Sequence, residues 1–207
     1  MNYRIIDISS WDRKQHYEHF KVMSDPYFGV IIPFDVTKAN KFSKANNVSF
    51  FGRYLHDCMR AINAEQNFKY RIKEDEVVEF DTIHASATIM RKNKTFGFSF
   101  IDFDENLSRF LDNLEAEKQR IFDSRELYPP KNSLDCIHCS ALPWVNFTGH
   151  KEPVSGKLDS VPKLAFGKAV NINGSLIMQV AINVNHALVD GYHLSQFAER
   201  FQEFLNE

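Results

Sequence analysis

Apolar residues recur at helical spacing in several stretches of the chain. The clearest stretch lies at about 49–64, where spacings of three and four repeat over the whole segment. Similar stripes predict helices at about 105–122 and from Asp190 to near the C-terminus, with Asp190 placed to cap the last helix. Near the N-terminus, Ser9 or Ser10 can cap one further amphipathic helix.

Between these helices the apolar pattern changes to that of strands. Runs rich in β-branched and aromatic residues predict strands at 27–36, 68–73, 77–80, 84–90, 95–101, 135–141, 164–170 and 176–185. The charged segments within 68–101 are typical of hairpin turns, so we expect one antiparallel block there. Asn173 and Gly174 both tolerate positive φ, which predicts a tight hairpin between the last two strands.

This order of elements predicts an α+β fold, a two-layer α/β sandwich in which helices cover a mostly antiparallel mixed sheet. The sequence contains no internal repeat and no low-complexity linker. We therefore expect residues 1–207 to form a single domain. The longest irregular segment, 150–161, lies where a substrate loop could be placed.

Composition constrains location and partners. The 207 residues include 25 Lys plus Arg against 27 Asp plus Glu, a formal charge of -2 that disfavours nucleic-acid binding. No apolar run is long enough to cross a bilayer. Three irregularly spaced cysteines, Cys58, Cys136 and Cys139, and the lack of a secretory leader favour a reduced, cytoplasmic protein. The 19 phenylalanines indicate an aromatic-rich core or pocket.

Candidate chemistry is concentrated where the last strand ends. His186 leaves the strand, Asp190 follows at a helix start, and Gly191 is expected to allow an unusual backbone turn. A neutral imidazole, with an ordinary pKa of about 6.5, can accept a proton from a hydroxyl and return it. The alternative interpretation is that His186 is an ordinary strand-end histidine and Asp190 only a helix cap.

Residues 185–193 also strongly resemble the His-His-x-x-x-Asp-Gly signature of the chloramphenicol acetyltransferase family. Dihydrolipoyl acyltransferases and other coenzyme A dependent acyltransferases share that signature more loosely. The second His of the signature is the family's general base, which implies this role for His186. Two positions depart from the pattern, because Asn185 stands where the family has its first His and Asn183 where it usually has Gln.

Other segments carry the same resemblance in the same order. Residues 140–147 look like the family's strand segment whose Ser donates a hydrogen bond to the tetrahedral intermediate, which implies that role for Ser140. The N-terminal segment is similar to one in which an Arg pairs with the Asp of the signature, and Arg13 is the matching residue. The similarity runs over nearly the whole chain.

The resemblance implies a reaction and an assembly. Its reaction is direct acyl transfer from acetyl-CoA to an acceptor hydroxyl, with no metal, in which Asp190 and Arg13 hold the backbone around His186. Its assembly is a homotrimer with active sites between subunits. Lys168 matches a family lysine near the coenzyme, although a solvated surface lysine explains it equally well.

The acceptor side matches the family less closely. Phe96 corresponds to a pocket aromatic, and Phe20 and Phe28 are further candidates to line the site. His150 belongs to a polar and charged loop where the family's loop is aromatic and Asn-rich. A flat aromatic antibiotic prefers apolar walls. Chloramphenicol is therefore the leading acceptor and another small hydroxyl compound the alternative.

The residues allow two further interpretations. Cys136, His138 and Cys139 offer metal ligands, but in a strand Cys139 points away from the other two and no second ligand pair exists, so no metal is expected. The rival from another class is a non-catalytic ligand-binding protein on the same fold, which the altered loop and Asn185 permit.

Overall fold

The computed structural model describes residues 2–153 and 159–207, so the central part of the expected 150–161 loop lies outside the described residues. A seven-stranded mixed sheet forms the centre, in the order β2-β10-β8-β7-β5-β6, with β9 also paired to β10. The pairs β5–β7 and β7–β8 are parallel and the others antiparallel. The strand bounds are β2 (Tyr27–Asp35), β5 (His84–Met90), β6 (Phe96–Phe98), β7 (Cys136–Ala141), β8 (Lys163–Phe166), β9 (Val170–Ile172) and β10 (Ser175–Asn185).

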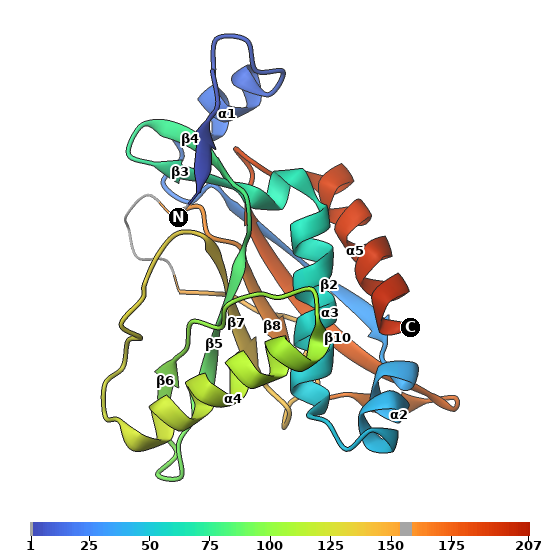
Figure 1. The fold of residues 1–207 in the computed structure, drawn as a ribbon. Coiled ribbons are helices and arrows are strands. Elements are labelled where there is room, and N and C mark those ends of the chain that lie inside the picture. Colours follow the sequence, from blue (N-terminus) through green and yellow to red (C-terminus); the bar gives the residue numbers. More distant parts are fainter. Residues whose placement is uncertain (1, 154–158) are drawn as a thin grey trace.

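Three long helices lie on one side of this sheet, as Figure 1 shows: α3 (Phe50–Ala64), α4 (Leu107–Asp123) and α5 (Gly191–Leu205). Ser49 caps α3 by accepting a hydrogen bond from the Gly52 amide at 3.2 Å. Gly52 also lets α4 approach closely, because a Cβ there would lie 2.4 Å from Leu111. Alternate residues of β10 are buried against the helices, which explains the apolar stripes of the sequence.

A smaller sheet, in the order β1-β4-β3, lies at one end of the molecule beside α1 (Lys14–Phe20) (Figure 1). Its strands are β1 (Tyr3–Ile5), β3 (Tyr70–Lys73) and β4 (Glu76–Phe80), and α2 (Thr37–Ala45) follows β2. The single antiparallel block predicted at 68–101 was therefore wrong. Both hairpins form, but they belong to different sheets, because β5 pairs in parallel with β7 and leaves β3 and β4 to pair with β1.

The predicted α+β class, the mostly antiparallel sheet and its helical cover are confirmed. The tight hairpin is also confirmed, with φ of 51° at Asn173 and 90° at Gly174, although its first strand is the short β9 and not 164–170. The predicted caps of α1 were wrong, since that helix starts at Lys14 and the Ser9 and Ser10 hydroxyls donate to the Asp7 carboxylate instead. The sequence pattern missed β1 and α2.

The sheet face away from the helices is polar near its centre. Ser86 of β5 pairs with His138 of β7, and His138 pairs in turn with Lys163 of β8. One step further along, Ser140 pairs with Ala165. Side chains two positions apart share a strand face, so these polar residues gather on one side of the sheet. Within the described ranges, no helix is both long and apolar enough to cross a membrane.

Candidate active site

His186 directly follows the last residue of β10. It lies at the end of the sheet that is near α1, beside the start of β2. The His186 amide donates to the Pro26 carbonyl at 2.9 Å, which continues the ladder between β10 and β2 by one residue. Asn185 is 1% exposed and fixes the turn that follows. Its side-chain oxygen accepts from the Ala187 amide and its side-chain nitrogen donates to the Asp159 carbonyl, both at 2.9 Å. Asn185 is therefore a structural anchor of this turn.

Two aromatic rings fix the imidazole of His186. Phe20, the last residue of α1, stacks on it with ring centroids 4.1 Å apart and planes inclined at 9°. Phe28 of β2 approaches it at 4.5 Å and 41°. Nδ1 of His186 is buried and has no hydrogen-bond partner among the described residues. Because stacked rings resist rotation of the side chain, the remaining ring nitrogen is held in one direction.

An ion pair between Arg13 and Asp190 lies next to the backbone of His186. Nη1 of Arg13 donates to Oδ2 of Asp190 at 2.6 Å, and Nη2 of Arg13 contacts the His186 carbonyl at 3.4 Å. The two side chains are 12% and 30% exposed. Although burial alone would raise the pKa of Asp190, the hydrogen bond from Arg13 and the charge of nearby groups hold it below its ordinary value. The pair joins the start of α1 to the turn after β10.

Asp190 also begins α5. Its carboxylate accepts from the Tyr192 amide at 3.0 Å, and its own amide donates to Nδ1 of His193 at 3.2 Å, a capping box. Burial lowers the pKa of His193, which favours the neutral imidazole that this bond requires. The special turn expected at Gly191 was wrong, because Gly191 is the first residue of α5 and does not have a positive φ.

Ser140 lies apart from His186 within one chain. Ser140 pairs with Ala165, and Ala165 pairs with Ala181 of β10. His186 follows Ala181 by five residues, so the two side chains are offset by about 16 Å along the strands and by two strand spacings across the sheet. That separation excludes direct contact between Ser140 and His186 of the same chain.

The other candidate residues divide between these two regions. Phe20 and Phe28 lie with His186, whereas Phe96 is 47% exposed on β6, where its ring is 5.4 Å from that of Phe98. His150 packs on Phe147 at 5.6 Å, near Ala181 and Asn183 on the polar side of the sheet. Lys168 is exposed, and its amide donates to the Val145 carbonyl at 2.8 Å.

The structure adds residues that the sequence analysis did not assign to a site. A cavity of about 340 Å³ opens beside Ser140 and is lined by Ser86, Thr88, His138, Glu152, Asp159 and Lys163, among others. A signal for some of them was present, because alternate positions of β5 and β7 are polar while the positions between them are apolar. Glu152, Asp159 and Lys163 lie outside or at the start of strands and carried no such signal.

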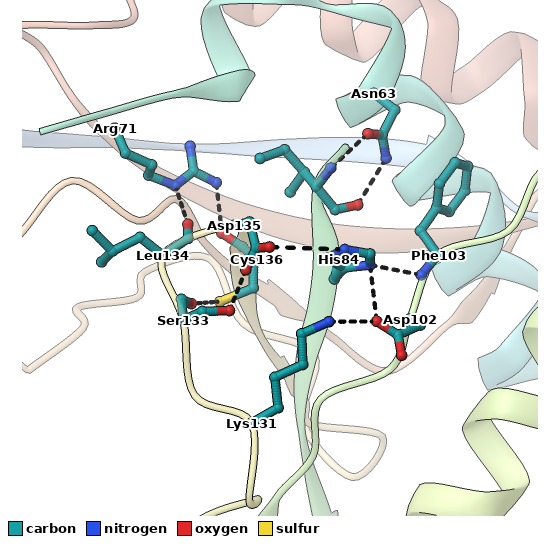
Figure 2. Close-up of polar contacts among 11 residues, drawn as sticks. Asn63, Arg71, His84, Asp102, Phe103, Lys131, Ser133, Leu134, Asp135 and Cys136 are labelled. Carbon is teal, nitrogen blue, oxygen red and sulfur yellow. Dashed lines mark hydrogen bonds and ion pairs between the residues drawn. The ribbon is translucent and has the colours of Figure 1, made fainter. Parts of the chain in front are cut away.

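A second polar cluster joins the starts of β5 and β7, as Figure 2 shows. Nδ1 of His84 accepts from the Phe103 amide at 3.0 Å and lies 3.4 Å from Asp102, which pairs with Lys131 at 2.8 Å. The other ring nitrogen lies 3.9 Å from Asp135. Burial, followed by the charge of Lys131, lowers the pKa of His84. A neutral His84 therefore accepts the Phe103 bond and ties together two connecting segments.

The buried guanidinium of Arg71 completes that cluster. It donates to backbone carbonyls of Leu134 and Cys136 at 2.8 and 2.5 Å (Figure 2), and also to those of Phe68 and Tyr70. Burial lowers its pKa to about 10, so it remains a cation at neutral pH. Arg71 thus fastens the small sheet to the start of β7.

The thiols offer no reactive group in the described part of the chain. Cys58, Cys136 and Cys139 are free and buried. Burial raises the pKa of Cys136 to about 12, which keeps it protonated. Among residues 2–153 and 159–207, no group of three His, Cys, Asp or Glu side chains is placed to hold a metal ion.

The sequence of this chain is similar to those of known proteins over almost its whole length. Residues 1–202 match the family model described as chloramphenicol acetyltransferase. A chloramphenicol acetyltransferase of Bacillus pumilus is 30% identical over 190 residues, which cover 90% of this chain and 86% of that protein. One from Klebsiella sp is 27% identical over 209 residues, covering 99% of this chain and 94% of that protein.

Solved structures agree with these sequence matches. A chloramphenicol acetyltransferase structure superimposes with a TM-score of 0.88 at 27% identity, covering 99% of this chain and 100% of that chain. The cubic core of the pyruvate dehydrogenase multienzyme complex superimposes with a TM-score of 0.68 at 13% identity, covering 92% and 86%. The second likeness concerns the fold alone.

Proposed function

This chain belongs to the chloramphenicol acetyltransferase family, and we propose that it transfers the acetyl group of acetyl-CoA to a hydroxyl group of chloramphenicol. The observation that carries this proposal is the placement of His186. A histidine at the end of a strand, clamped between Phe20 and Phe28 and supported by the Arg13–Asp190 pair, is arranged as a base of fixed orientation. The whole of residues 1–207 serves as one acyltransferase domain.

His186 acts as the general base of a direct transfer. Since Nδ1 is buried, Nε2 takes the proton from the acceptor hydroxyl while the hydroxyl oxygen attacks the thioester carbonyl carbon. The tetrahedral intermediate then expels the thiolate of coenzyme A, which recovers the proton from the imidazolium. The products are the acetyl ester and free coenzyme A, and no acyl-enzyme forms.

Ser140 supplies the hydrogen bond to the oxyanion from a neighbouring subunit. The register of the sheet separates Ser140 from His186 of the same chain, so the two can cooperate only across an interface between copies. A homotrimer with cyclic symmetry brings the His186 region of one subunit to the Ser140 region of the next, three times per assembly. The exposed ring of Phe96 belongs to the Ser140 side of such an interface.

Acetyl-CoA is the second substrate. Lys168 is exposed beside a surface on which Trp144 and Val145 are 64% and 48% exposed. A cation next to exposed apolar side chains suits a cosubstrate that joins phosphates to a largely apolar arm. The residues present therefore fit the coenzyme, with Lys168 on its phosphates.

Cytoplasmic location and chloramphenicol resistance follow from this function. Acetyl-CoA is a cytoplasmic metabolite, and the free, buried state of the three cysteines suits a reducing compartment. An enzyme that esterifies chloramphenicol there would protect the cell that makes it. Growth of a sensitive strain on chloramphenicol, with and without the wild-type chain, tests the expected resistance, and fractionation of the same cells tests the location.

The decisive experiment is thiol release from acetyl-CoA by the purified protein with chloramphenicol as acceptor. We expect turnover in the wild type and none above background in His186→Ala. Release with another hydroxyl compound alone would overturn the assignment of the acceptor. Coenzyme binding without release, across a panel of hydroxyl compounds, would instead support a non-catalytic binding protein.

A further inference from the structure

Two sets of contacts hold the backbone on either side of His186. The Arg13–Asp190 pair holds it from the side of α1. The second set comes from Asn185, the last residue of β10, whose side-chain amide is buried. A buried amide needs hydrogen-bond partners, and those of Asn185 join the turn after β10 to residues 159–161.

Each end of the Asn185 amide has its own partner. Oδ1 accepts from the Ala187 amide, and Nδ2 donates to the carbonyl of Asp159, both at 2.9 Å. The amide group is planar and rigid, so the position of the Asp159 carbonyl determines where the turn can lie. His186 is the residue between Asn185 and Ala187, and it therefore follows that position.

Residues 159–161 are in turn fixed by three other strands. The contacts are short polar ones, from the Tyr27 hydroxyl of β2 to the Val161 carbonyl at 2.9 Å, from the Ile72 amide of β3 to Oγ of Ser160 at 2.8 Å, and from Nζ of Lys163 of β8 to Oδ2 of Asp159 at 2.7 Å. Burial raises the pKa of Tyr27 well above its ordinary value, so its hydroxyl stays protonated and can donate. A segment held at several points is a rigid support for the Asn185 amide.

The same segment also reaches the cavity beside Ser140, which the Asp159 and Lys163 side chains line. Their ion pair, and the bond from the Val161 amide to Oδ1 of Asp159 at 3.0 Å, do not involve Asn185. We therefore expect these side chains to keep their places when Asn185 is changed. Asn185 acts on the base and not on the acceptor cavity.

We propose that Asn185 is a positioning residue for the acetyl transfer, which holds His186 in place against residues 159–161 through its Nδ2 bond. This inference rests on the acetyl transfer proposed above and gives its base a second support, separate from the Arg13–Asp190 pair. Asn185 takes no part in the chemistry and affects the reaction only through His186.

Loss of this bond should displace the imidazole. The turn that carries His186 would become free to move relative to Phe20, whose ring stacks on the imidazole. A displacement of about 1 Å in a reacting group can cost about 100-fold in rate. The binding of acetyl-CoA and chloramphenicol does not depend on this bond, so kcat should fall while KM changes little.

Two variants loosen the support from opposite ends. Asn185→Ala removes both bonds of the side-chain amide. Tyr27→Phe removes only the hydroxyl that holds the Val161 carbonyl, and it leaves the aromatic ring and the Asn185 amide in place. The two variants combined show whether both effects pass through residues 159–161.

Asn67→Ala is the matched control. Asn67 is also buried, and its Nδ2 donates to the same turn, at the Leu188 carbonyl, at 2.8 Å. This bond joins the turn to the short helix Gln66–Lys69 and not to residues 159–161. The control therefore weakens the turn by one buried hydrogen bond and leaves the proposed support intact.

Thiol release with chloramphenicol gives the constants. We expect Asn185→Ala to lower kcat by about tenfold and Tyr27→Phe by about threefold, with KM for both substrates within about twofold of the wild type. The double variant should lose no more than Asn185→Ala alone, because both changes act through one segment. Asn67→Ala should change kcat by less than about twofold. Equal losses of kcat in Asn67→Ala and Asn185→Ala, or effects that multiply in the double variant, overturn the proposal.

Nuclear magnetic resonance reports the position of His186 without turnover. In protein with isotope-labelled histidine, the ring current of the stacked Phe20 displaces the imidazole resonance that His186→Ala removes. We expect this displacement to shrink in Asn185→Ala and less so in Tyr27→Phe, and to stay unchanged in Asn67→Ala. If Asn185→Ala does not fold, Tyr27→Phe decides alone, and a wild-type kcat with a wild-type resonance overturns the proposal.

This resonance separates the proposal from the proposed reaction. A reduced displacement in Asn185→Ala, in a protein whose wild type releases no thiol, supports the positioning of His186 by Asn185 and overturns the acetyl transfer. Turnover by the wild type, with kcat and the resonance both unchanged in Asn185→Ala, does the reverse.

Discussion

The imidazole of His186 stacks face to face on the ring of Phe20, with the ring centroids 4.1 Å apart. The two residues are 166 positions apart in the sequence, at the end of a strand and at the end of a short helix. Their contact couples the position of the proposed base to the packing of α1.

Phe20→Leu should lower kcat by about fivefold to tenfold, because the loss of a stacked aromatic pair frees the imidazole to leave its productive orientation. KM for acetyl-CoA should change little, since Phe20 lies on the His186 side of the site. Steady-state thiol release measures both constants. Phe122→Leu removes a ring that is 45% exposed on α4 and should leave them unaltered. Equal constants for Phe20→Leu and wild type would show that stacking does not position His186.

Asp190→Ala should lower the free energy of unfolding by about 1 to 3 kcal/mol, since it removes a helix cap and leaves the mostly buried Arg13 without its partner. Asp190→Asn should cost less, because Asn also caps helices. Urea unfolding followed by circular dichroism gives these values. Arg4→Lys, in the surface pair with Glu79, should leave the free energy of unfolding essentially unchanged, because solvent screens that pair. Equal losses for the Ala and Asn variants would contradict the capping role.

Ser140→Ala should lower kcat by about 100- to 1,000-fold, the usual loss when one oxyanion donor is removed. The melting temperature should stay close to that of the wild type, because Ser140 lines a cavity and deletion of its hydroxyl breaks no described hydrogen bond. Single-turnover rates and calorimetry of the same preparation make the comparison. A variant with full activity would remove Ser140 from the mechanism.

Mixed assemblies test whether the site spans two subunits. His186→Ala and Ser140→Ala are each expected to retain at most about 1% of the wild-type activity alone, but a trimer that contains both can unite an intact His186 with an intact Ser140. Co-refolding equal amounts should restore about a quarter of the wild-type activity, if subunits mix at random around a closed ring. Failure to recover activity in trimers shown by mass spectrometry to be mixed would place both groups within one subunit.

His84 should make the protein less stable as the pH falls. Burial lowers its pKa in the folded state, whereas in the unfolded chain it returns to about 6.5. The unfolded state therefore binds the proton first, so the stability that His84 contributes is present above about pH 6.5 and is lost progressively below it. His84→Asn keeps an acceptor for the Phe103 amide and removes the titration.

The free energy of unfolding, measured in urea between about pH 7.5 and 5.5, should therefore fall less steeply for His84→Asn than for wild type. Buried His56, whose pKa is also lowered, retains its own dependence on pH in both proteins. Identical slopes would mean that His84 titrates alike in the folded and unfolded states.

The local pattern of the sequence was sufficient for most elements. The apolar stripe of α3, the Asn173–Gly174 turn and the cap Asp190 were all predictable, because each depends on neighbours within one turn of helix or one hairpin. The motif around His186 was readable for the same reason, since the strand end and the helix start are adjacent in the chain. The partner of each strand could not be predicted in this way, because paired strands can be far apart in the chain. For example, β5 pairs with β7 although 45 residues separate Met90 from Cys136.

What the sequence alone determined, then, is the element order, the family resemblance and the candidate base. The tertiary structure decided which side chains meet: Phe20 with His186, Arg13 with Asp190, and Glu152 with the cavity of Ser140. These contacts depend on strand register and on helix packing, and both are determined by many weak interactions between segments that are distant in the sequence. No local pattern encodes that sum, and the separation of Ser140 from His186 within one chain became visible only when the sheet was assembled.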